Sequence, residues 1–197
     1  MRGIPSCAAG QLAPAAFLLR AWARRLAVPL AAGVLAVAAL PQAARAEPSA
    51  IAFTSGPLAG VAAEDVTRKE EDLANRGTKV SESALFQSNG MLAYVNWARL
   101  TSRYVWQNSD LKGLTEEVRQ VFKAADVTVL SGDRDVVKGF RVQYRDIRLS
   151  RPDRRCGLFE MQRMQNDIFG FVCRADDQQV PILAVMEGLA IKDVIGP

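Results

Sequence analysis

The chain has 197 residues, of which 25 are basic, 21 are acidic and none is histidine. The lack of histidine excludes the Ser-His-Asp triad, the Cys-His dyad and most zinc sites. The sequence also contains no Walker A loop and no dinucleotide fingerprint, so we expect no cofactor and no metal site.

An export signal is predicted at the N-terminus. Residues 1–46 carry five arginines and no acidic residue, residues 26–40 are apolar, and residues 44–46 form an A-x-A site. This order is typical of a secretory signal peptide, so cleavage is predicted after Ala46, with an uncleaved anchor as the alternative. The leader is rich in alanine and arginine, which indicates a bacterial protein that is periplasmic or secreted.

Loss of the leader changes the charge of the chain. Removing five of the 25 basic residues leaves 20, against 21 acidic residues, and therefore a net charge of −1. We expect neither nucleic acid as a partner nor stable membrane insertion after cleavage. The remaining length suits one domain at residues 61–197, preceded by an extended N-terminal arm at residues 47–60 in which residues 51–53 could add an edge strand.

Two cysteines remain after cleavage, Cys156 and Cys173, and an even pair in an exported protein predicts a disulfide. Two buried free thiols are the alternative. Residues 155–174 have two apolar runs around a polar turn, which predicts a β-hairpin closed at its mouth by the disulfide. Pairing the cysteines centres the hairpin on residues 164–165, ahead of the better turn formers at residues 166–167, so we expect a longer loop or a bulge in one arm.

Helices are predicted from the apolar spacing in several segments. Residues 61–76 are weakly amphipathic, and residues 111–125 repeat apolar residues at clear helical spacing. Residues 81–106 fit both a helix and a strand, and a helix over residues 91–100, followed by a short extended piece, is the preferred interpretation. Residues 181–191 are predicted to form a C-terminal helix that closes the core.

The apolar period changes to that of β-strands after residue 125. Residues 127–130 are predicted to be a strand, residues 131–135 a polar turn, and residues 140–146 a half-buried strand. Ile147 and Leu149 break the alternation, for which we expect a bulge near residues 145–146. Together the elements predict an α+β fold, with two or three helices against a small antiparallel sheet of three to five strands.

A run of arginines beside the hairpin is a candidate site for an anion or an acidic partner surface. Its members are Arg145, Arg148, Arg151, Arg154 and Arg155. The alternative is ordinary strand-edge arginines paired with Asp146, Asp153 and Glu160.

Two further sets of residues are candidates for a site. Tyr94, Trp97 and Trp106 could line an aromatic pocket, although aromatic side chains commonly fill the core. Asp146, Glu160 and Glu187 lie next to apolar positions and could act as paired carboxylates in glycoside hydrolysis. The Asp133-Arg134-Asp135 motif is interpreted as a solvated turn rather than a metal site.

The segment from Cys156 to Cys173-Arg174, followed by an acidic pair, resembles the C-terminal module of the bacterial 17-kDa surface-antigen outer-membrane proteins. The resemblance covers residues 155–174 alone and does not include the glycine-rich, membrane-associated part of that family. No function is carried across from it.

The first functional hypothesis is a non-catalytic exported envelope protein that binds another envelope or secretion component. It rests on the missing catalytic groups and on the small, disulfide-clamped domain. The alternatives are a carboxylate-based hydrolase of cell-wall or polysaccharide material and a small-ligand carrier. The sequence leaves the oligomeric state and the identity of the partner open.

Overall fold

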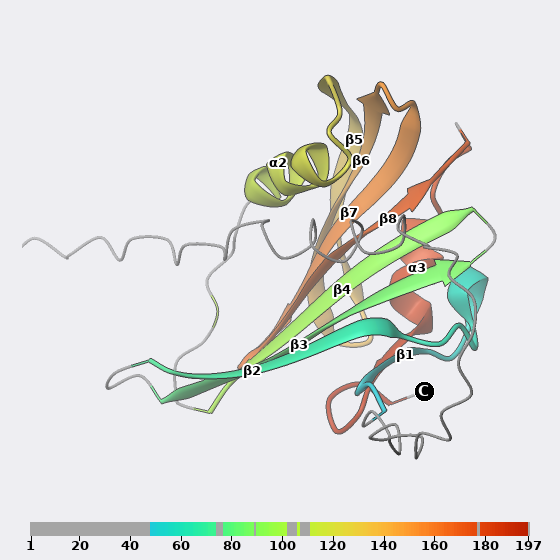
Figure 1. Ribbon diagram of the computed structural model, residues 1–197. Helices are drawn as coiled ribbons and strands as arrows, with labels where there is room; N and C mark the ends of the chain where they lie inside the picture. The colour runs from blue at the N-terminus through green and yellow to red at the C-terminus, as the bar shows by residue number, and fades with distance from the viewer. Residues whose placement is uncertain are drawn as a thin grey trace, which may run out of the picture.

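The computed structural model describes residues 48–73, 77–88, 90–101, 106, 111–176 and 178–196, so the leader predicted for residues 1–46 lies outside the described residues. Seven strands form one antiparallel sheet in the order β2-β3-β4-β8-β7-β6-β5, and β1 and β9 form a second, two-stranded sheet (Figure 1). The strands are β1 Ile51–Phe53, β2 Glu64–Asp72, β3 Thr78–Ser88, β4 Met91–Leu100, β5 Asp126–Val137, β6 Phe140–Ser150, β7 Arg154–Arg163, β8 Asn166–Arg174 and β9 Leu189–Ile191.

The predicted helix-packed α+β fold is therefore wrong, because the described chain is mostly β. Its α-helices are two short ones, α2 (Lys112–Val121) and α3 (Ile182–Gly188), beside a single 3-10 turn η1 (Gly56–Leu58). The segments predicted as helices at residues 61–76 and 91–100 contain the strands β2 and β4 instead. None of the helices in the described ranges is long and apolar enough to cross a membrane.

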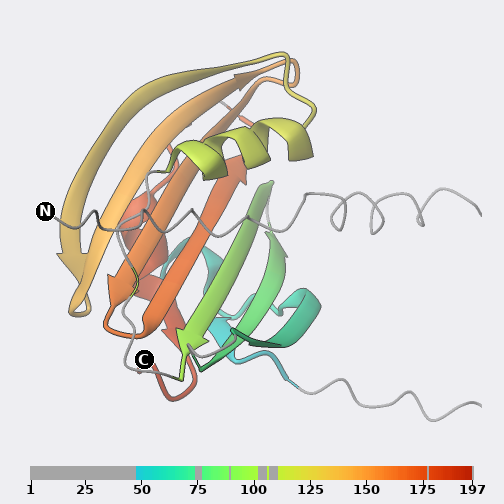
Figure 2. The same cartoon turned by 90° about the vertical axis from the view of Figure 1, so that its left-hand side faces the viewer.

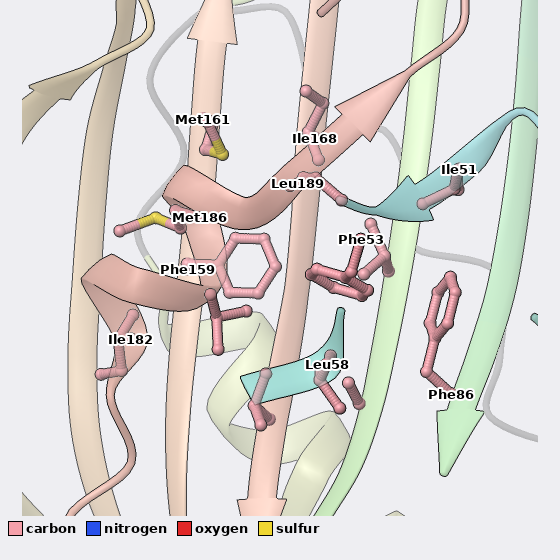
Figure 3. Close-up of a cluster of buried hydrophobic side chains, with 14 of the residues drawn as sticks. Ile51, Phe53, Leu58, Phe86, Phe159, Met161, Ile168, Ile182, Met186 and Leu189 are labelled. Atoms are coloured by element: carbon pink, nitrogen blue, oxygen red, sulfur yellow. The ribbon is translucent and has the colours of Figure 1, made fainter. Parts of the chain in front are cut away.

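The helices lie on opposite sides of the large sheet and define its two faces (Figure 1). On the α2 face, Leu114 and Val118 of the helix pack in one cluster with Ile147, Leu158 and the two cysteines. On the α3 face, the helix, η1 and the small sheet cover a larger core (Figure 3). That core includes Ile51, Phe53, Leu58, Phe86, Phe159, Met161, Ile168, Ile182, Met186 and Leu189.

The two-sided burial explains why β6 lacked a simple alternating pattern. Phe140 and Val142 are buried on the α3 face, whereas Ile147 and Leu149 are buried on the α2 face. The strand changes its buried face along its length because α2 covers only one end of the sheet (Figure 2). The bulge expected at residues 145–146 lies instead on the neighbouring strand, where the register shifts between Val129 and Ser131 of β5.

The turn predicted at residues 131–135 is also wrong, because β5 continues to Val137. The β5–β6 hairpin turns at Lys138 and Gly139, whose φ angles are 50° and 75°. Positive φ at both central residues is the signature of a type I′ turn, which matches the twist of paired strands. The register closes on Val137 opposite Phe140.

The disulfide predicted between Cys156 and Cys173 is confirmed, with an S–S distance of 2.02 Å and the two residues directly opposite each other on β7 and β8. The expected longer loop or bulge is wrong, because the ladder runs without a shift to a tight turn at Met164 and Gln165. Met164 takes a φ of 51° there. The carbonyl of Gln165 accepts hydrogen bonds from the Leu100 N–H at 3.0 Å and from an indole N–H at 2.7 Å, which hold this turn in place.

The segment after the predicted cleavage site is built into the fold. β1 pairs with β9, and the Phe53 ring meets the Phe86 ring edge-on with centroids 4.9 Å apart. The buried Glu82 carboxylate accepts hydrogen bonds from the Ser49 hydroxyl, the backbone N–H groups of residues 50 and 51, and the Arg68 guanidinium, at 2.6–3.4 Å. The predicted C-terminal helix ends early, at Gly188, because β9 follows directly.

Candidate functional site

The structure does not gather the candidate arginines on one face. Arg148 pairs with Asp153 through two hydrogen bonds of 2.9 and 2.7 Å, and Arg155 pairs with the buried Asp146. Both of these pairs lie on the α3 face, because their strand positions alternate with Ile147 and Cys156.

The other three candidate arginines lie elsewhere. Arg145 and Arg154 lie on the α2 face, where the Arg154 guanidinium stacks 5.2 Å from the Phe122 ring centroid. Arg151 is exposed in the loop between β6 and β7. The predicted set is thus split between two faces and a loop, and two of its members are neutralised by aspartates.

The candidate aromatic residues also lie apart. Tyr94 stacks on Phe171 under α2, with centroids 5.6 Å apart. Trp97 packs against the core of the α3 face and donates a 3.2 Å hydrogen bond to Asn166. Trp106 donates its indole N–H to the Gln165 carbonyl at the β7–β8 turn. Since Tyr94 and Trp97 lie on opposite faces of one sheet, these side chains do not line a common pocket.

The three candidate carboxylates are separated as well. Asp146 faces the α3 side and is held by Arg155, whereas Glu160 faces the α2 side and Glu187 is exposed on α3. Glu160 instead pairs with a residue that the sequence analysis missed, Asp167 of β8.

This carboxyl pair, Glu160 and Asp167, is buried on the α2 face, with exposed fractions of 4% and 7%. Amide groups of Gln143 and Gln162 donate hydrogen bonds to the two oxygens of Glu160, the second at 3.0 Å. Burial, and then the neighbouring charge of Glu160, raise the pKa of Asp167 from the ordinary 3.8 to about 7. One oxygen of Asp167, Oδ1, accepts no hydrogen bond within the described part of the chain. Asp167 therefore exchanges its proton near neutral pH, where an ordinary aspartate is fully ionised.

A signal for this pair was present in the cysteine spacing. With Cys156 opposite Cys173, an unshifted ladder places Gln162 opposite Asp167 and makes Glu160 its diagonal neighbour on the same face. The bulge expected in this hairpin would have changed that register, so Asp167 was not a candidate.

A hollow of about 230 Å³ opens on the sheet beside the carboxyl pair. Its lining residues are Arg134, Asp135, Arg141, Val142, Gln143, Glu160 and Gln162. Arg134 and Arg141 are exposed at this hollow, and within the described ranges neither forms an ion pair. The lining thus combines the two guanidinium groups with two carboxyl groups, of the exposed Asp135 and the buried Glu160.

The hollow adjoins β5, which is a terminal strand of the large sheet (Figure 2). Exposed apolar side chains concentrate on this strand: Val129, Leu130 and Val136 are 53%, 45% and 67% exposed. The opposite terminal strand, β2, carries mostly charged residues, as expected of an edge protected against pairing.

The outer edge of β5, which pairs with no strand among the described residues and is called the free edge below, also presents backbone hydrogen-bonding groups. Because Val137 and Phe140 flank a two-residue turn, they form a hydrogen-bonded pair, and the ladder alternates from there. The N–H and C=O groups of Val136, Arg134 and Gly132 consequently point away from β6. Two of these N–H groups, of Arg134 and Val136, donate to the side chain of the preceding aspartate at 2.7 Å each.

A comparison with models of known protein families finds no match, and neither does a comparison with curated proteins. Inference about function therefore depends on the geometry of the chain itself.

Proposed function

We propose that the protein is a non-catalytic binding module of the bacterial envelope, which captures an extended segment of another exported protein on the free edge of β5. The observation that carries this proposal is the concentration of exposed apolar side chains on that terminal strand. An extended peptide added to a sheet edge gains main-chain hydrogen bonds, and the alternating side chains of the edge supply specificity.

The leader predicted for residues 1–46 and the Cys156–Cys173 disulfide support an exported protein. A disulfide persists in oxidising compartments such as the periplasm. The disulfide-linked hairpin β7–β8 belongs to the same sheet as β5, with β6 between β7 and β5.

Acid–base hydrolysis is the second candidate, and the raised pKa of Asp167 favours it. Glycosidases keep their two carboxyl groups about 5–9 Å apart so that substrate and water fit between them. Here Asp167 hydrogen-bonds to Glu160, and both side chains are almost fully buried. A polysaccharide therefore does not fit between the two carboxyl groups, and binding of an extended segment of another protein is the better-supported function. Carriage of a small ligand is not supported, because Tyr94 and Trp97 lie on opposite faces of the sheet and do not line one pocket.

The test is photo-crosslinking in cells that produce the full chain. A photoreactive amino acid at position 130 of β5 is expected to give a discrete adduct with another protein, and the same amino acid at position 70 of β2 is expected to give none. The adduct should disappear in Val136→Pro, which removes an outward N–H without breaking the ladder to β6, and persist in Val136→Ile. An adduct that forms equally at both positions, or that survives Val136→Pro, refutes the proposal.

A further inference from the structure

The charges beside β5 are sorted by face. On the α2 face, Arg134 of β5 and Arg141 of β6 are diagonal neighbours at the hollow. On the α3 face, Asp133 and Asp135 of β5 are both exposed. Residues of an added strand alternate between the same two faces, so an occupant of this edge meets positive charge on one side and negative charge on the other.

The two aspartates also set a condition on the occupant. Their carboxylates accept the outward N–H groups of Arg134 and Val136, at 2.7 Å each. A carbonyl of an incoming strand must replace each carboxylate oxygen on that N–H group. The displaced carboxylates are then free to pair with cations of the incoming strand, which offsets the loss of their hydrogen bonds.

A second copy of the chain does not meet this condition. If β5 paired antiparallel with its copy around Arg134, the two copies of Arg134 would face each other and Asp133 would face Asp135. A register centred on either aspartate would place that aspartate opposite itself. Like charges directly opposite each other destabilise a strand pair, so the charge pattern works against self-association through this edge.

We propose that the occupant of β5 is an extended segment of another protein in which acidic and basic residues alternate. Its acidic side chains lie on the α2 face against Arg134, with Arg141 one strand further in, and its basic side chains lie on the α3 face against Asp133 and Asp135. This inference rests on the proposed function and adds to it the chemistry of the partner.

The test measures peptide binding to the purified, oxidised chain by fluorescence anisotropy. The probes are labelled decapeptides that alternate glutamate with lysine, threonine with glutamate, threonine with lysine, and threonine with glutamine. The Glu/Lys peptide is expected to bind tightest and to weaken with added salt, because exposed charge pairs are screened.

Single substitutions separate the charge contribution from general binding. Arg134→Gln is expected to weaken the Glu/Lys peptide about fivefold and Arg141→Gln about twofold, which is the range for exposed ion pairs. Arg99→Gln removes an exposed arginine of β4 and serves as the matched control, with affinity unchanged.

The outcomes distinguish this inference from the proposed function. If the Thr/Gln peptide binds as tightly as the Glu/Lys peptide and Val136→Pro abolishes both, the alternating-charge partner is refuted and strand addition is retained. If no peptide binds, or Val136→Pro changes nothing, both are refuted. Sedimentation as a dimer that Val136→Pro dissociates would assign the edge to a second copy and also refute the inference.

Discussion

Replacing Asp167 with asparagine tests the buried carboxyl pair most directly. Asparagine keeps the shape of the side chain and stays neutral, and its amide can donate to Glu160. In the native chain the pKa of Asp167 is about 7, because the side chain is buried and lies beside Glu160. In the unfolded chain the same carboxyl titrates near 3.9.

The sign of the pH dependence follows from these values. A raised native pKa contributes stability that is fully present below about pH 4 and is lost as the pH rises through about 7, because the unfolded chain releases its proton first. Each pH unit between the two values is worth about 1.4 kcal/mol, so the loss is at most about 4 kcal/mol. Asp167→Asn is therefore expected to be about 2–4 kcal/mol more stable than the native chain at pH 8 and nearly equal to it at pH 4.

Urea unfolding followed by tryptophan fluorescence, repeated from pH 4 to pH 8, measures this difference. Equal m-values in the two proteins show that both unfold from equally compact states. Asp133→Asn, at an exposed position of β5, is the control and is expected to keep the native pH dependence. If Asp167→Asn loses stability with rising pH in parallel with the native chain, the proton is not held at Asp167 and the reasoning is refuted.

Two further predictions concern the hairpin. Cys156→Ala is expected to lower the free energy of unfolding by about 3 kcal/mol, or roughly 6–12 °C in Tm, under oxidising conditions. The variant should not respond to reductant, and an unchanged Tm would contradict a stabilising disulfide. Gly170→Ala is expected to cost about 3 kcal/mol or more, because its Cβ would lie 2.2 Å from the Tyr94 carbonyl oxygen of the neighbouring strand. Gly157→Ala, whose Cβ would lie 2.2 Å from the buried side chain of Ile182 and not from a backbone atom, should cost less, about 1–2 kcal/mol, and equal losses would show that backbone contact is not the cause.

The local patterns that predicted correctly were those read from one buried face. Leu114 and Val118 are buried at helical spacing in α2, and the paired cysteines lie opposite each other in the hairpin. In α2 the period of the apolar residues equals the period of the helix. The disulfide was predicted on a different ground, the even pair of cysteines in a chain with an export signal.

Prediction failed where both faces of a strand are covered. Met91, Leu92 and Ala93 are all buried in β4, so the strand shows no alternation and its sequence also fits a helix. The prediction for the edge strand β2 failed for the opposite reason. Few of its residues are buried and most are charged, so its sequence has no alternation of apolar and polar residues. For the site, Glu160 was a candidate, whereas Asp167 was missed because the bulge expected in the β7–β8 hairpin would have changed the register that brings Asp167 beside Glu160.

The pairing of β1 with β9 means that the chain can complete its folding only after its C-terminal segment is available. Thr54, which follows β1, bonds to the backbone of Gly188, 134 residues later. A ribosome or an export channel delivers a polypeptide from its N-terminus, so β1 emerges well before its partner strand β9. The core of the α3 face can form completely only after β9 has been delivered. Until then the side chains of Ile51 and Phe53 stay exposed to solvent.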